Sequence, residues 1–154
     1  MNNECRIGRP NVALSYMYKA LAIESKDGSS GTRCSQAGTK LNVCAILSAQ
    51  KKHQNAVMFA KSAIADYETL LTDVQIGLVE ASASAQTQFE ELDLATLLLS
   101  ASIAYYNLGA EHEHCREFRS AHSAFETSLK YAMKAPPEVA SQMIKEASRS
   151  LKEV

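Results

Sequence analysis

The stretch AYYNLGAEHEHCREFRSAHSAFETSLKYA, residues 104–132, decides the expected fold of this chain. Small and apolar residues recur in it at spacings of three and four, on both sides of a polar break at 116–117. This is the periodicity of an amphipathic helix, so the stretch predicts two helices folded back on each other. The positions expected where the two backbones cross are Leu108, Gly109, Ala121, Phe125 and Ser128.

Length and composition set the class of protein. The chain has 154 residues, enough for one domain with a buried core, and we treat residues 1–154 as a single domain. Its formal net charge is −1, and its basic residues are scattered along the sequence. Nucleic acid is therefore not an expected partner, because phosphate binding depends on clustered Lys and Arg.

The sequence predicts a cytoplasmic protein without a membrane span. Residues 1–10 are polar where an export signal would be apolar. The most apolar run, 92–110, is interrupted by Asp93 and Asn107 and falls short of the roughly 20 apolar residues that cross a bilayer. The four cysteines are widely and irregularly spaced, which in this compartment favours reduced thiols.

Helical periodicity and its interruptions divide the chain into segments. Pro10 and Asn11 suit a helix start before 12–25, and the stretch 26–34 (KDGSSGTRC) is expected to be a flexible loop. Ser35 is the expected cap of a helical pair over 35–71, and 72–91 is either a linker or a helix extension. A second pair follows over 92–135, and Pro136 and Pro137 separate it from a last amphipathic helix at 137–152. The prediction is an all-α protein.

Two of these pairs resemble tetratricopeptide repeats. In 102–135 the pattern is carried by Tyr105, the Leu108-Gly109 pair, His112 in an aromatic position, and Ala121, Phe125 and Ser128 at the crossing. In the same frame, 37–70 places Val43-Cys44 at the Leu-Gly pair and Ala56, Ala60 and Ala63 at the crossing. The resemblance implies antiparallel helical hairpins stacked as a short right-handed superhelix, with 12–25 as a half repeat and 137–152 as a capping helix.

The spacing departs from a simple array of 34-residue repeats. Ala56 and Ala121 lie 121 − 56 = 65 residues apart, and no recognisable unit stands between them. We therefore expect elongated, degenerate repeats, which are similar to those of kinesin light chains and of protist and ciliary proteins of this family. The cytoskeleton or a cilium is thus an alternative location within the cytoplasm.

The segment EHEHC, residues 111–115, is the strongest candidate for chemistry, and it does not predict an enzyme. His112 and Cys115 share a helical face, but zinc needs about four ligands in paired spacing, and His122 is the only further candidate nearby. Cys44 and Cys115 are accounted for as small apolar residues, and DGSSGT lacks the ending of a phosphate loop. No metal and no cofactor is expected.

The resemblance implies instead that the first helix of each hairpin lines a groove for a protein or peptide partner. The candidate binding residues are Leu41, Asn42, Ala45, Tyr106, Asn107, Ala110 and His114. An Asn amide both donates and accepts, so it can hold a peptide backbone, and Tyr106 can serve as an anchor. Alternatively, Asn42 and Asn107 bond to a neighbouring helix. No cation stands at the positions with which chaperone-binding members of the family grip a carboxylate, so a less charged peptide or helix is expected.

The expected function is therefore a non-catalytic scaffold or adaptor module. The alternative is a structural subunit of a cytoskeletal or ciliary assembly. The half repeat at 12–25 favours self-association or a longer repeat array, since its apolar face would otherwise be exposed.

Overall fold

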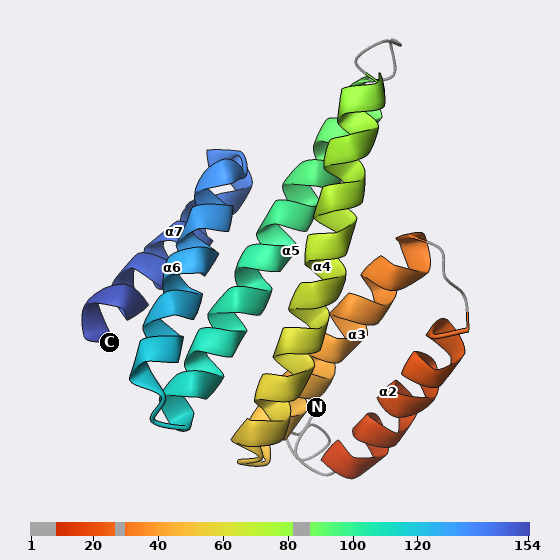
Figure 1. Cartoon of the computed structure of the whole chain (residues 1–154). Helices are drawn as coiled ribbons and strands as arrows, with labels where there is room; N and C mark the ends of the chain where they lie inside the picture. Colours follow the sequence, from red (N-terminus) through yellow and green to blue (C-terminus); the bar gives the residue numbers. More distant parts are fainter. Residues whose placement is uncertain (1–8, 27–29, 82–86) are drawn as a thin grey trace, which may run out of the picture.

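The computed structural model describes residues 9–26, 30–81 and 87–154, and this part of the chain is all-α. Consecutive helices pack on one another in chain order, and α7 also contacts α5 (Figure 1). None of the helices described is long and apolar enough to cross a membrane. The helices are α2 (Pro10–Glu24), α3 (Ser30–Ala49), α4 (His53–Ala81), α5 (Thr87–His114), α6 (Phe118–Lys134) and α7 (Pro137–Glu153).

Several helix boundaries differ from those expected. α3 begins at Ser30, so it includes part of the loop expected at 26–34, and Ser35 lies inside the helix instead of capping it. The Ser35 hydroxyl donates to Glu24 of α2 at 2.8 Å. α2 starts directly after Arg9, and Asn11 accepts a hydrogen bond from Gln50 instead of capping the helix. Of the stretch 72–91, expected to be a linker or a helix extension, most is helical: α4 continues to Ala81 and α5 begins at Thr87. Residues 82–86 lie outside the described part of the chain.

The two central hairpins have the same turn. α3 ends at Ala49 and α4 begins at His53, while α5 ends at His114 and α6 begins at Phe118. Lys51 and Arg116 have φ of 64° and 60°, and the amides that follow them bond back to the carbonyls of Leu47 and His112 at 2.9 and 2.8 Å. This is the Schellman ending of a helix. Both turns thus repeat in register, 116 − 51 = 65 residues apart.

Small residues at the helix crossings let the backbones approach closely. Gly109 lies against the ring of Phe125, where an added Cβ would stand 2.7 Å from two ring carbons. Two helical turns earlier on α5, Ser102 meets Ser128 of α6; both are fully buried, and each hydroxyl donates to the other residue's carbonyl, at 2.8 and 2.7 Å. In the first hairpin the residues at the Leu-Gly pair and at the crossing of the expected repeat are buried: Val43, Cys44, Ala56, Ala60 and Ala63.

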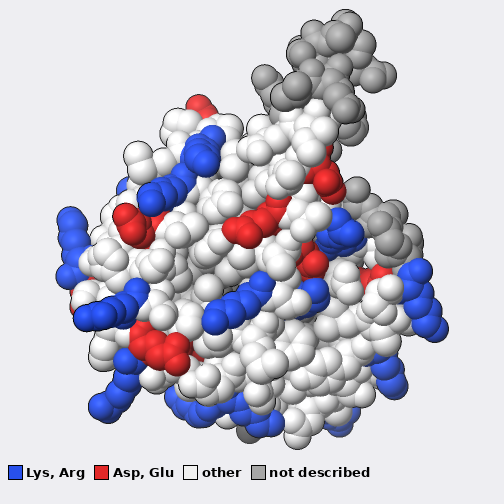
Figure 2. All heavy atoms as spheres, viewed as in Figure 1, with Lys and Arg blue, Asp and Glu red and all other residues white. Residues whose placement is uncertain are grey.

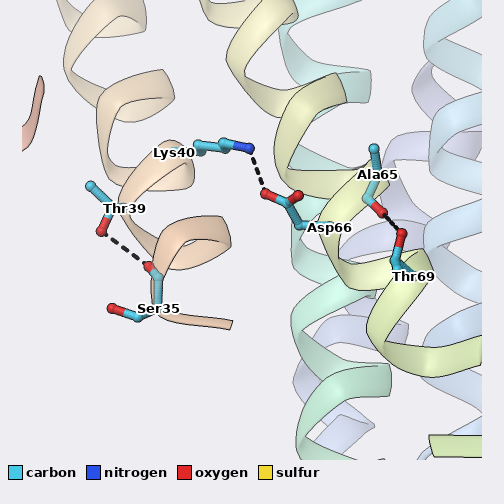
Figure 3. Close-up of polar contacts among 6 residues, drawn as sticks. All are labelled: Ser35, Thr39, Lys40, Ala65, Asp66 and Thr69. Atoms are coloured by element: carbon cyan, nitrogen blue, oxygen red, sulfur yellow. Dashed lines mark hydrogen bonds and ion pairs between the residues drawn. The ribbon is translucent and has the colours of Figure 1, made fainter. Parts of the chain in front are cut away.

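Polar contacts also join neighbouring helices. Lys40 of α3 reaches Asp66 of α4 at 2.5 Å in a largely buried ion pair (Figure 3). The hydroxyls of Thr39 and Thr69 bond instead to carbonyls four residues earlier in their own helices. Tyr105 of α5 donates to Glu68 of α4, and its ring stacks on Tyr131 of α6 at 5.6 Å. α4, α5 and α6 are therefore held together by one tyrosine.

Candidate functional site

The seven predicted binding residues lie on α3 and α5, and six of them are in matching positions, His114 being the exception. A shift of 65 residues relates Leu41 to Tyr106, Asn42 to Asn107, and Ala45 to Ala110. Asn42, Ala45 and His114 are exposed, while Leu41, Tyr106, Asn107 and Ala110 are half-buried. Because the turns repeat in register, the two first helices present equivalent residues at equivalent heights above the turn.

The structure does not join the two sets into one continuous wall. α3 and α5 both pack on α4, and direct contact between α3 and α5 is slight. Among the described residues, no hydrogen bond or ring contact connects a predicted residue of α3 with one of α5. Neither hydrogen bonds nor ring contacts thus link the two sets directly in the described part of the chain.

Asn42 and Asn107 have amides available to a partner. Within the described part of the chain, neither side chain forms a hydrogen bond to a neighbouring helix. An amide on a helix surface offers two donor hydrogens and an acceptor oxygen. Two such groups at the same position of two hairpins can pair with a peptide backbone without selecting its side chains.

Tyr106 is engaged inside the fold. Its ring lies 5.3 Å from the ring of Phe125 of α6, in a tilted arrangement. Its hydroxyl accepts a hydrogen bond from Ser150 of α7 at 3.3 Å. The phenol group expected to anchor a partner therefore also anchors the last helix.

His114 belongs to a cluster that sequence reasoning did not find. Its ring stacks on His53 of α4, with centroids 4.2 Å apart and planes 10° apart. His53 Nδ1 lies 2.7 Å from a carboxylate oxygen of Glu111, which is buried. His53 directly follows the first turn and Glu111 lies 58 residues later, so no local pattern links them. Only the pairing of α4 with α5 brings them together.

His112 of the EHEHC segment also has a structural partner. His112 is buried, and its Nδ1 lies 2.5 Å from a carboxylate oxygen of Glu117 in the turn. Among the residues that the structure describes, no three His, Cys, Asp or Glu side chains are grouped so that they could hold a metal ion.

Cys44 and Cys115 show no sign of activation as nucleophiles. Burial raises the pKa of Cys44 from its usual 9.0 to about 11, and the nearby charge of Glu111 adds to the effect. Burial likewise raises the pKa of Cys115, with contributions from Glu117 and Glu111. A nucleophilic cysteine needs the opposite shift, since the thiolate is the reactive form.

Two of the surface hollows in the described part of the chain are lined by residues other than the predicted ones. One of about 360 Å³ lies between α5 and α6, lined by Tyr105, Leu108, His112, Arg119 and hydroxyl side chains of α6. The other, of about 520 Å³, lies along α2 and is lined by Leu14, Tyr18 and their neighbours. Neither is lined by any of the seven predicted residues.

Comparisons with known proteins do not assign this chain to a family. No protein-family model matches it, and neither a curated protein nor a solved structure is significantly similar to it.

Proposed function

We propose that this protein is a non-catalytic interaction module of the tetratricopeptide type, acting as a scaffold or adaptor in the cytoplasm. Its hairpins would stack as a short right-handed superhelix, with α7 as the capping helix. The ligand would be an extended peptide or a helix of a partner protein, held across α3 and α5. The observation that carries the proposal is the matched pair Asn42 and Asn107, both without an internal hydrogen bond among the described residues.

The geometry of the hairpins supports this reading. Equivalent turns at Lys51 and Arg116 place Asn42 and Asn107 at the same height above their turns. A bound peptide would therefore meet one side-chain amide on each hairpin. Small exposed or half-buried neighbours, Ala45 and Ala110, leave room for a backbone to approach. Tyr106 and His114 would add contact area at the α5 side, since both are partly accessible.

The test is to remove both amides and measure binding. A partner is first captured from cells, and the affinity of its binding segment is then measured by calorimetry for the wild type and for Asn42→Ala/Asn107→Ala. Losing two hydrogen bonds of about 0.5–1.5 kcal/mol each predicts an affinity roughly 5- to 150-fold lower. Unchanged helicity by circular dichroism would show that the fold is intact.

Asn55→Ala is the matched control. Asn55 is an exposed asparagine in the first turn of α4, outside the proposed groove. Its replacement should leave the affinity unchanged. If the double variant binds as the wild type does, or if Asn55→Ala weakens binding as much, the groove assignment fails.

The second candidate function is that of a structural subunit in a cytoskeletal or ciliary assembly. It rests on α2, whose outer face carries exposed apolar side chains: Val12 (44% exposed), Tyr16 (68%) and Ile23 (71%). An end of a helical stack normally has a polar outer face. Sedimentation of the wild type and of Tyr16→Ser/Ile23→Ser tests it, with the equally exposed Met58→Ser on α4 as control. Self-association lost only in the α2 variant would favour the subunit; a monomeric wild type would count against self-assembly.

A further inference from the structure

Five exposed cations lie at the end of the molecule where the hairpin turns are found. Arg9 precedes α2, Lys51 and Lys52 form the α3–α4 turn, Arg116 stands in the α5–α6 turn, and Arg119 lies in the first turn of α6. We call these five residues the basic rim. Figure 1 shows the start of α2 and both turns at one end, and Figure 2 shows Lys and Arg along the corresponding lower edge.

Contacts between neighbouring elements hold this end together. Gln50 at the α3–α4 turn donates to Asn11 of α2 at 3.1 Å. His53 of α4 stacks on His114 of α5 at 4.2 Å and contacts Glu111. The turns therefore form a connected surface.

The cations of the basic rim are not neutralised by neighbours. Within the described residues, none of the five takes part in an ion pair. Three carboxylates lie in or next to the α5–α6 turn. Glu111 contacts His53, Glu117 contacts His112, and Glu113 is exposed. Around the two turns and the start of α2, the five exposed cations therefore outnumber the three carboxylates named here.

Two of the cations occupy positions where glycine would favour the fold. Lys51 and Arg116 have positive φ, which L-residues with a side chain adopt at a cost. Glycine is the usual residue at this place in a Schellman ending. A role of the positive charge in binding would explain why both hairpins have a cation at this position instead of glycine.

The shape of the basic rim points to a broad anionic surface. Its cations are spread over three successive parts of the fold, and one of them, Arg119, lines the hollow between α5 and α6. A narrow acidic peptide would be better held in a lined groove.

An exposed aromatic side chain completes the surface. Phe118 opens α6 between Arg116 and Arg119 in the sequence and is 54% exposed. Cations together with an exposed aromatic group are what bind the interface of an anionic bilayer. We propose that the basic rim docks on an anionic lipid membrane, with Phe118 entering the headgroup region.

The test is cosedimentation of the full chain with lipid vesicles. Vesicles of phosphatidylcholine with an equal amount of phosphatidylserine should bind the wild type, vesicles of phosphatidylcholine alone should not, and added salt should weaken binding. Lys51→Gly/Arg116→Gly should bind roughly 25-fold more weakly, about fivefold for each cation removed. Phe118→Ser should also weaken binding. The glycine variant should fold, since glycine suits both positions.

The matched control is Lys145→Gln/Arg149→Gln on α7, which removes the same charge from two exposed positions outside the basic rim. It should bind nearly as well as the wild type. The proposal is overturned if this control loses as much affinity as the glycine variant, or if the wild type ignores anionic vesicles. Binding to polyglutamate or to duplex DNA in place of vesicles would overturn it too. Asn42 and Asn107 are unchanged in all these variants, so the outcome is separate from that of the groove.

Discussion

At the scale of single residues, Gly109 sets how closely α5 and α6 approach. An added Cβ would stand 2.7 Å from Cδ1 and Cε1 of Phe125, so Gly109→Ala must push the ring or the helix aside. We expect a loss of about 1–3 kcal/mol in the free energy of unfolding, measured in urea. Gly38→Ala is the control, because no heavy atom lies within 4 Å of its Cβ position, and it should stabilise helix α3 by about 0.5–1 kcal/mol. Equal effects of the two changes would contradict the close crossing.

Lys51 and Arg116 are the residues whose backbone conformation is least favourable. Both have positive φ, and glycine adopts that region without a Cβ clash. Lys51→Gly and Arg116→Gly should each raise the free energy of unfolding by about 0.5–1 kcal/mol, or the melting temperature by roughly 2–4 °C. Lys61→Gly, at an exposed position inside α4, should lower it. A melting temperature lowered by the turn variants would mean that the turns are not in this conformation.

Cys44 should make stability depend on alkaline pH. Burial, and then Glu111, raise its pKa from 9.0 to about 11, so the folded chain keeps the proton longer than the unfolded chain does. The stabilisation is complete below pH 9 and is lost as the pH rises toward 11, amounting to about 3 kcal/mol at most. Chemical unfolding between pH 8 and pH 10 should show a shallower pH dependence for Cys44→Ala than for the wild type. Tyr105, whose pKa is also raised by burial and by Glu68, adds a later decline in both proteins. If the unfolding free energies of the wild type and of Cys44→Ala fall in parallel as the pH rises, the Cys44 thiol is not buried as described.

At the scale of helices, Ser102 and Ser128 tie α5 to α6. Each donates to the other's carbonyl in a fully buried site. Ser102→Ala should therefore cost about 1–2 kcal/mol of unfolding free energy, because it removes one of these bonds. Ser141→Ala on the exposed face of α7 should change it little. A thermal melt of both variants measures the difference, and a neutral Ser102→Ala would mean that the helices do not cross there.

Helical periodicity predicted the helices better than it predicted their ends. The α5–α6 hairpin follows from Leu108, Gly109 and Phe125, because apolar spacing and a small residue at the crossing act through local geometry. The early start of α3 could not be predicted from the sequence, because a stretch rich in Gly and Ser favours a loop. There Ser35 contacts Glu24 of α2, and Arg33 pairs with Asp73 of α4 at 3.8 Å, so tertiary contacts override local propensity.

At the scale of the whole molecule, the two ends of the helical stack differ. The exposed face of α7 is rich in charged and polar residues, as a terminal helix requires, whereas α2 exposes Tyr16 and Ile23. The third distinctive surface, the basic rim, lies across the turns. These surfaces would let one small module contact a peptide, a membrane and a further copy or partner.

The candidate site was predictable only in part, for a physical reason. Asn42 and Asn107 could be paired from the sequence because both hairpins keep the same register around their turns. The contact of Tyr106 with Ser150, and that of His53 with Glu111, join residues 44 and 58 positions apart. Such contacts depend on how separate helices pack, which no local pattern encodes.

In the proposed function, the first helices α3 and α5 hold a partner through Asn42 and Asn107. Nuclear magnetic resonance of the side-chain amides, recorded while the captured partner's binding segment is added, tests it most directly. The amide signals of Asn42 and Asn107 should shift together and saturate with the same dissociation constant, while that of Asn55 stays in place. Binding that shifts Asn55 and leaves Asn42 and Asn107 unmoved would contradict the claim.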